Sequence, residues 1–247
     1  MLGLSYVPVL AQLGEDFFQN REGAAEKCPG NNGLCLGWIA DNFGDYVDPL
    51  WEHVLLSIVP LAIGFLIATG LALFAHRYRI LAPFFLFFVG TLFTIPSIAF
   101  YLILLNITGR GFTTAVVVLT AYTQVLIYRN VMTGLQEVPR EAVDVAEGMG
   151  LTRRQSLTRV ELPLAVPAII AGVRVATVTT ISLATIAAFI TPLGLGAPIF
   201  SAIQTGANTE FVAASLLAIA LALIADVLIV MLQRVLTPWV RARSVAR

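Results

Sequence analysis

Charged residues are scarce in this sequence. Asp, Glu, Lys and Arg make up 12% of its 247 residues, whereas ordinary soluble domains carry about 25%. Hydrophobic residues instead make up 58% of the chain, and its mean hydropathy is +0.86. The shortage of charge excludes a soluble domain for most of the chain.

Cysteine is also rare, with only Cys28 and Cys35 in the whole chain. They bracket a stretch of Gly, Asn and Pro that favours a turn. On an oxidising outer face they can form a disulfide that closes a small loop, and two free thiols are the alternative. No histidine lies near them, and two thiolates fall short of the four ligands that zinc usually takes, so we expect no metal site.

A signature of nucleotide hydrolysis is missing too. The chain contains no Gly-x-x-x-x-Gly-Lys-Ser/Thr loop, which cradles the phosphates of ATP in many ATPases. If ATP drives this protein, another chain must hydrolyse it. We therefore expect that this chain is not the ATPase and holds neither ATP nor Mg itself.

What the chain does have is five long apolar segments. A helix needs about 20 apolar residues to cross the hydrocarbon core of a membrane. The third and fourth segments are rich in Thr, Ser and Ala, and small residues let helices approach closely in a bilayer. The sequence therefore predicts an all-α membrane protein, a polytopic bundle of about five transmembrane helices. The five segments are residues 54–75, 82–105, 111–128, 163–190 and 211–233.

The basic residues are distributed unevenly about these segments. Eleven of the 15 lie between the first and second segments, between the third and fourth, or at and after the end of the fifth. Cytoplasmic loops are enriched in Lys and Arg, so the N-terminus is predicted outside and the C-terminus in the cytoplasm. Residues 1–52 then form an extracytoplasmic tail, 53–236 the transmembrane domain with a cytoplasmic loop at 136–162, and 237–247 a cytoplasmic tail.

Proline interrupts the second segment. Pro96 removes a backbone hydrogen bond and bends the helix, and Thr94 and Ser97 can satisfy the freed groups. The result is either a simple kink or a broken helix that lines a translocation path. Hydroxyl side chains of the fourth segment leave a similar choice, since each can line such a path or bond back to its own helix. They are Thr177, Thr179, Thr180, Ser182 and Thr185.

Two charges lie within the predicted spans. Arg174 and Asp226 each fall towards the inner half of their segments, where an unpaired charge is costly. We expect them to pair with each other or with a neighbouring subunit. The two histidines carry less information: His53 is expected at the interface, capping a helix, and His76 in solvent within a basic turn.

The loop at 136–162 contains signals for two short helices. Pro139 suits the first turn of a helix, Gly150 can adopt the left-handed conformation that ends one, and Thr152 can cap the next. The loop is either a compact knob that fits the groove of a partner or an amphipathic segment on the inner membrane face.

The spacing within this loop resembles the EAA loop of ABC importer membrane subunits. That pattern is Glu-Ala-Ala, three residues, Gly, nine residues, Ile, one residue and Leu-Pro, with Asp and Val here replacing the first Glu and Ala. In the family, this loop docks on the ATP-hydrolysing partner, so the resemblance implies that it couples this chain to an ATPase. The coupling residues it implies are Asp144, Val145, Ala146, Gly148, Gly150, Val160, Leu162 and Pro163.

Other stretches resemble the osmoprotectant branch of that family, whose members import glycine betaine, carnitine or choline. The Thr-Ile-Pro-Ser run at 94–97 and the stretch 161–196 are similar to segments of these permeases. The departure is TPLGLG at 191–196, where the branch has a more Gly-rich turn, and this affects the shape of the outer gate. The resemblance spans about residues 50–236.

The resemblance implies the MetI-like fold of type I importers in the inner membrane of a prokaryote. The partners would be two ATPase subunits holding ATP and Mg, a second permease subunit, identical or related, an extracytoplasmic substrate-binding protein and membrane lipid, with no nucleic acid. The substrate would be a small osmolyte of the glycine betaine, choline or carnitine type. Alternatives are an ABC permease for another solute such as methionine, an ATP-independent carrier or channel, and a membrane scaffold.

Overall fold

The computed structural model describes residues 35–238, which fold almost entirely into helices. This confirms the predicted all-α architecture. The elements in chain order are α2 (Leu36–Asp41), η1 (Phe43–Tyr46), α3 (Val47–Arg77), η2 (Arg79–Leu81), α4 (Ala82–Thr94), α5 (Ser97–Thr108), α6 (Phe112–Gln136), α7 (Arg140–Gly148), α8 (Arg153–Ser156), η3 (Leu157–Glu161, a π-helical turn), α9 (Leu162–Ala187), α10 (Gly196–Thr205) and α11 (Asn208–Leu236).

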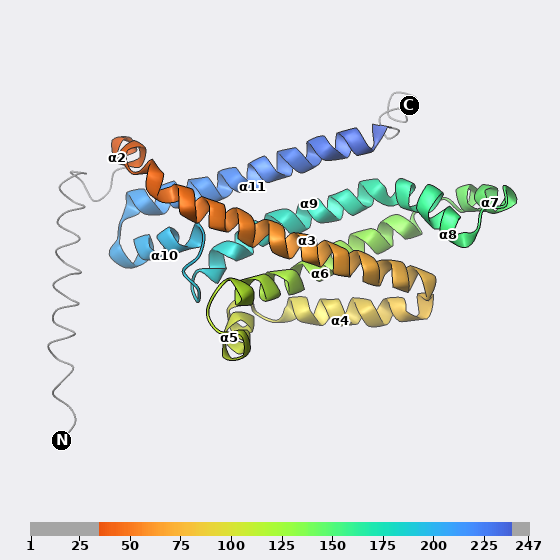
Figure 1. The fold of residues 1–247 in the computed structure, drawn as a ribbon, viewed down its shortest axis with the longest axis horizontal. Coiled ribbons are helices and arrows are strands. Elements are labelled where there is room, and N and C mark those ends of the chain that lie inside the picture. Colours follow the sequence, from red (N-terminus) through yellow and green to blue (C-terminus); the bar gives the residue numbers. More distant parts are fainter. Residues whose placement is uncertain (1–34, 239–247) are drawn as a thin grey trace, which may run out of the picture.

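The long helices run roughly side by side and match the five predicted spans. Among the described residues, four helices are long and apolar enough to cross a membrane, and the broken pair α4–α5 makes a fifth if it is one span. Figure 1 shows α7 and α8 beyond one end of the bundle, called the α7 end below, and α2 and α10 at the opposite end, called the α10 end. The basic turn after α3 and the C-terminal part of α11 also lie at the α7 end.

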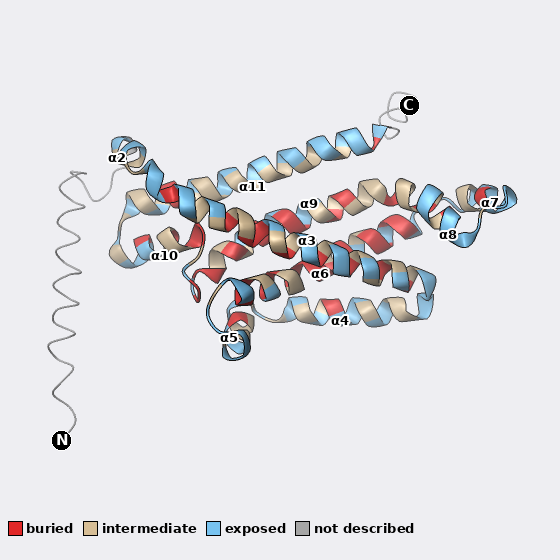
Figure 2. Ribbon diagram, viewed as in Figure 1, coloured by how far each residue is buried: buried red, intermediate tan, exposed pale blue. Residues whose placement is uncertain are grey.

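Helix α6 forms the centre of the bundle, where it packs extensively on both α3 and α9. Small residues permit this close packing: a Cβ on Gly64 of α3 would collide with the Thr123 hydroxyl of α6, and one on Gly172 of α9 would lie 2.5 Å from the Asn130 Cβ. In α6, 61% of the most apolar stretch is buried, but none of that of α11 is, and Figure 2 shows this contrast. One side of α11 is thus left for lipid or another subunit.

The second predicted span is broken rather than smoothly kinked. Helix α4 ends at Thr94, α5 begins at Ser97, and their axes differ by 93°. The hydroxyl of Thr94 donates to the carbonyl of Thr91, one turn back in its own helix. The carbonyl of Ile95 is satisfied by the Tyr122 hydroxyl of α6, a contact between distant parts of the sequence that was not predicted.

The boundaries of other elements also differ from prediction. The second short helix of the loop is not separate, because α8 continues through η3 into α9 as one helix of 35 residues, Arg153–Ala187. Helix α10 was not predicted. It follows the TPLGLG turn and ends at Gly206, whose φ is 71°. Helices α2 and η1 and the start of α3 fall within the predicted tail at 1–52.

Candidate functional site

The loop at the α7 end is held by a well-defined helix stop. Gly150 has a φ of +79°, its N–H bonds the carbonyl of Glu147 at 2.9 Å, and the N–H of Leu151 bonds that of Ala146 at 3.1 Å. These two bonds form the Schellman motif, in which a left-handed glycine satisfies the last carbonyls of a helix. The predicted role of Gly150 in ending the helix is therefore confirmed. Pro139 precedes α7 as its N-cap rather than lying in its first turn.

A capping box starts the next helix two residues later. The backbone N–H of Gln155 bonds the Thr152 hydroxyl at 3.4 Å, and the Gln155 side-chain oxygen accepts the Thr152 N–H at 2.8 Å. Such reciprocal bonds satisfy two free N–H groups of a helix start. The predicted cap at Thr152 is confirmed. The loop at 136–162, called the knob below, therefore contains a turn that is fixed by the end of α7 and the start of α8.

Two large apolar side chains are exposed on the otherwise charged surface of the knob. Val145 is 61% exposed and Met149 is 66% exposed, whereas Ala146 is buried and holds α7 against its neighbours. Scattered exposed apolar residues are common, but two on one knob suit burial by a partner. Met149 was not among the predicted coupling residues, although its place in a charged run was a usable signal. Of the other implied coupling residues, Asp144 and Gly148 are exposed, and Val160, Leu162 and Pro163 are half-buried.

A polar contact ties the knob to the bundle. The Nε2 atom of His76, in the last turn of α3, lies 2.7 Å from the Glu161 carboxylate at the end of η3. Both side chains are largely shielded, with 16% and 11% exposure. The expectation that His76 is simply solvated is therefore wrong, because the last turn of α3 lies within hydrogen-bond distance of η3. This contact joins η3, at the C-terminal end of the knob, to the last turn of α3.

Two neighbouring side chains of α3 secure the turn at the α10 end. Nδ1 of His53 accepts the N–H of Leu195 at 3.2 Å, and Nε2 lies 3.1 Å from the carbonyl of Ile181. Because Nδ1 accepts, Nε2 must carry the proton and donate. The carboxylate of Glu52 accepts the N–H of Gly194 at 2.9 Å. His53 is fully buried because the TPLGLG turn covers it, and its expected position at the membrane interface stays a prediction.

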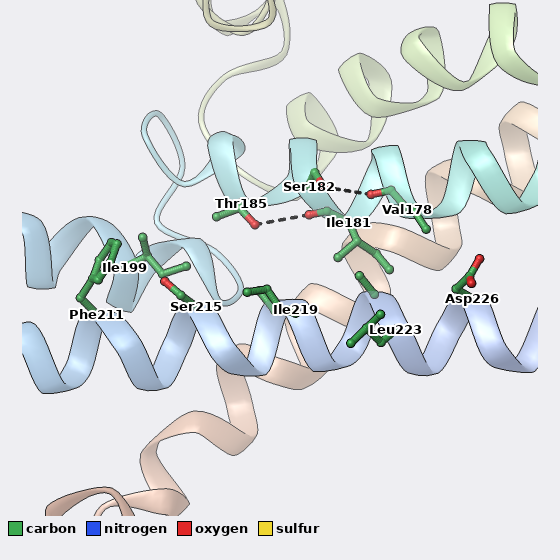
Figure 3. A pocket seen from close by; sticks show the side chains of 12 residues that line it. Val178, Ile181, Ser182, Thr185, Ile199, Phe211, Ser215, Ile219, Leu223 and Asp226 are labelled. Atoms are coloured by element: carbon green, nitrogen blue, oxygen red, sulfur yellow. Dashed lines mark hydrogen bonds between the residues drawn. The ribbon is translucent and has the colours of Figure 1, made fainter. Parts of the chain in front are cut away.

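A cavity of about 590 Å³ lies between α9, α10 and α11. Figure 3 shows its lining: Ile199 and Phe211 lie towards the α10 end, Ile219 and Leu223 follow along α11, and Asp226 lies at the other end. The lining is mostly apolar, with a few hydroxyls and this one carboxylate. An apolar cleft with a few polar groups is the usual form of a small-molecule site.

The predicted path residues divide into three groups in space. Thr185 lines the cavity and still donates to the carbonyl of Ile181 at 3.3 Å, and Ser182 lines it in the same way, donating to the carbonyl of Val178 at 3.1 Å. Thr177 and Thr180 do not line it, because they face the bundle and bond their own helix at 2.8 and 2.7 Å. Thr94, Pro96 and Ser97 lie at the α4–α5 break, apart from this cavity.

Arg174 of α9 and Asp226 of α11 form an ion pair across the two helices. Nη2 of Arg174 lies 2.7 Å from Oδ2 of Asp226, and Nε donates to Oδ1. This two-pronged geometry is the strongest way for a guanidinium to bind a carboxylate. The structure thus adopts the first of the two pairings expected from the sequence. The side chains are 46% and 25% exposed in the single chain, so a ligand or a second subunit can reach them.

The remaining predictions from the sequence concern cysteines and metals. Cys35 is disulfide-bonded, but Cys28 lies outside the described residues, so their pairing stays a prediction. Within residues 35–238, no group of three or more His, Cys, Asp or Glu side chains is arranged to hold a metal ion.

Solved structures share this fold. The chain matches the inward-facing MetNI methionine ABC transporter with a TM-score of 0.67 and 22% identity, covering 76% of this chain and 94% of that one. It also matches an amino acid ABC transporter with histidines, with a TM-score of 0.65 and 16% identity, covering 82% and 99%. At these identities the likeness concerns the fold alone, and it confirms the predicted MetI-like architecture.

Sequence relatives are more informative about family. The chain is 30% identical over 201 residues to the choline transport system permease protein OpuBB of Bacillus subtilis strain 168, covering 81% of this chain and 93% of that protein. It is 32% identical over 197 residues to the carnitine transport permease protein OpuCD of Listeria monocytogenes, covering 79% and 88%. It is 32% identical over 208 residues to the osmoprotectant import permease protein OsmW of Salmonella typhimurium, covering 82% and 97%.

The family model for the "Binding-protein-dependent transport system inner membrane component" matches residues 58–242. This range contains the knob with its Schellman stop, the cavity and the Arg174–Asp226 pair. Together with relatives that span most of the chain, the match settles the question of family. The chain belongs to the binding-protein-dependent inner membrane transport components and is an ABC importer permease, similar to proteins named for the transport of choline, carnitine and osmoprotectants.

Proposed function

We propose that this permease carries a quaternary-ammonium osmolyte, such as glycine betaine, carnitine or choline, and that the knob at 136–162 couples it to a separate ATPase. The osmolyte class is supported by the names of the relatives. The observation that carries the coupling role is the knob itself, which is fixed at both helix ends and presents exposed Val145 and Met149.

The geometry offers a direct route from the knob to the cavity. Helix α8 continues through η3 into α9, and α9 lines the cavity with Ser182 and Thr185. A displacement of the knob by an ATPase would therefore tilt the continuous helix Arg153–Ala187, whose C-terminal part lines the cavity. ATP and Mg would belong to the ATPase, which would bind ATP to turn the pathway outward and hydrolyse it to reset the pathway.

A knob that meets an ATPase requires one orientation of the chain in the membrane. The α7 end would face the cytoplasm, in keeping with the basic residues gathered there, and the α10 end would face a substrate-binding protein outside. A second permease subunit, identical or related, would complete the pathway, because a single chain leaves the cavity open along α11.

Uptake by a reconstituted transporter tests this function. Proteoliposomes would contain this subunit, the ATPase and substrate-binding protein encoded beside it, and any sister permease, and labelled glycine betaine would be supplied outside. We expect saturable uptake that stops when the ATPase carries a substitution that abolishes hydrolysis.

Two other outcomes would distinguish the choice of solute from the coupling to an ATPase. ATP hydrolysis stimulated by a binding protein loaded with methionine, without betaine uptake, would keep the ATPase coupling and discard the osmolyte. Uptake that persists without the ATPase would indicate a gradient-driven carrier and overturn the coupling role of the knob.

A further inference from the structure

The ion pair at the end of the cavity is unusual for a structural contact. Asp226 lines the cavity, whose other lining near it is apolar, including Leu223 and Ile219. Its partner Arg174 is 46% exposed, so the pair is accessible rather than sealed inside the bundle. A charged pair in a membrane-spanning segment is costly unless it stays paired, and an apolar pair would hold the two helices together as well. The location therefore points to a ligand.

Charge balance restricts which ligand can enter this pair. A solute that displaces Arg174 from Asp226 must give Asp226 a cation, and it leaves the guanidinium without an anion unless it brings one. A simple cation such as choline satisfies only Asp226. A zwitterion with a carboxylate and an ammonium group satisfies both residues, so the number of unpaired charges within the span remains zero throughout the exchange.

The cavity also restricts the kind of ammonium group. Its apolar walls offer few groups to replace the water around a small, strongly hydrated ion. A quaternary ammonium group carries its charge under a shell of methyl groups and donates no hydrogen bonds, so it loses little on entering such walls. The planar guanidinium, in turn, binds a carboxylate through two parallel N–H bonds.

We propose that Arg174 and Asp226 form an exchange site for a zwitterion: the carboxylate of the solute takes the place of Asp226 on the guanidinium, and its quaternary ammonium group lies against the Asp226 carboxylate. The inference rests on the proposed osmolyte function and narrows it to a preference for carboxylate-bearing osmolytes, such as glycine betaine or carnitine, over a simple cation such as choline. When the solute leaves, Arg174 and Asp226 pair again and close the inner end of the cavity.

The test compares two solutes that differ in the carboxylate. Uptake of glycine betaine and of choline is measured with the complete reconstituted transporter, and the affinity of the unchanged binding protein for each solute is determined separately. In the double variant Arg174→Gln/Asp226→Asn, which removes both charges together, betaine uptake per complex should fall about tenfold and choline uptake less than about threefold. Arg110→Gln, at an exposed arginine away from the pair, should leave both rates unchanged.

A second variant covers the case in which the double variant does not assemble. Arg174→Lys keeps the charge but loses the two-pronged donor, so betaine uptake should fall about threefold while choline uptake does not change.

A purely structural pair predicts a different pattern: the double variant would transport betaine at the wild-type rate, or betaine and choline would fall by the same factor, and either result overturns the exchange site. Wild-type protein that transports both solutes, with an unchanged ratio in the variants, overturns this inference alone. Wild-type protein that transports neither overturns the osmolyte function and the exchange site together.

Discussion

Gly150 fixes the shape of the knob because its φ of +79° is one that residues with a Cβ avoid. We predict that Gly150→Ala destabilises the helix stop by about 1–2 kcal/mol, which lowers the ratio of native to altered knob about 5- to 30-fold. Binding of the ATPase to purified permease should weaken, by at most that factor, as measured by titration in detergent.

Gly148 supplies the matched control. It is also exposed, a Cβ added to it would meet no other atom within 4 Å, and it lies in α7 with a negative φ. Gly148→Ala should bind the ATPase at least as well as wild type, because alanine favours the helix. Equal weakening by both substitutions would mean that the surface of the knob, rather than its backbone conformation, determines docking.

His53 is a second residue whose neighbours define a clear expectation. His53→Phe keeps an aromatic ring at this position but removes both ring nitrogens, so the N–H of Leu195 and the carbonyl of Ile181 lose their partners. A buried unsatisfied group costs about 1–3 kcal/mol, so thermal unfolding of the purified subunit should begin several degrees lower.

Glu52→Gln serves as the control for that prediction. The amide oxygen of glutamine can still accept the N–H of Gly194, so the melting temperature should remain close to that of wild type. A larger loss with Glu52→Gln than with His53→Phe would show that the negative charge, and not the buried imidazole, secures the turn at the α10 end.

At the scale of elements, the contact between α3 and η3 makes the knob part of the bundle. Without the His76–Glu161 contact, movement of the knob would reach α3 only through the apolar packing of η3 and α9 on the bundle. We predict that Glu161→Ala raises the number of ATP molecules hydrolysed per solute transported, because ATPase docking survives while its motion is transmitted less completely.

Two further variants show whether the contact itself is responsible. His76→Ala should have the same effect, and the double variant should be no worse than either single one, as expected for two residues that act through one contact. Glu137→Ala, at an exposed carboxylate just after α6, should leave the ratio unchanged. Additive effects of His76→Ala and Glu161→Ala would reject a shared pathway.

Some elements were predictable from sequence and others were not, for physical reasons. Spans follow from apolar length, and the turn between α7 and α8 follows from local chemistry at Gly150 and Thr152, so both were predicted correctly. The burial of His53, the link of His76 to Glu161 and the bond of Tyr122 to Ile95 join residues 27 to 142 positions apart. No local pattern contains that information. Arg174 and Asp226 were predictable despite their separation, because charges within spans have few possible partners.

At the scale of the whole molecule, the bundle is asymmetric. Helix α6 is enclosed by α3 and α9, whereas α11 contacts the rest of the chain mainly through α9 and α10. The cavity between α9, α10 and α11 therefore lies at the edge of the chain rather than at its centre. Such an arrangement suits a half-pathway that a second subunit completes, and it leaves both the exchange site and α11 within reach of that subunit.

The two ends of the molecule must also lie on opposite sides of the membrane if the knob is to meet an ATPase. We predict this from single cysteines placed in a variant that has serine at positions 28 and 35. Gln155→Cys, on α8, should react with a membrane-impermeant maleimide only in inverted vesicles, and Ser201→Cys, on α10, only in intact cells. Both positions are exposed. A cysteine that fails to react is therefore shielded from the maleimide by the membrane and not by burial in the protein.

The broken pair α4–α5 provides an internal check on that result. Two further exposed positions are Thr108, at the end of α5, and Arg79, in the turn after α3. Thr108→Cys should react from the same side as Ser201→Cys, and Arg79→Cys from the same side as Gln155→Cys. The α4–α5 pair then crosses the membrane once despite its 93° bend. Labelling of Thr108→Cys from the cytoplasmic side would instead make α4–α5 a re-entrant loop, and α6 would have to begin on the cytoplasmic side. The knob could then not share a side with the turn after α3, and the contact between His76 and Glu161 could not form in the membrane.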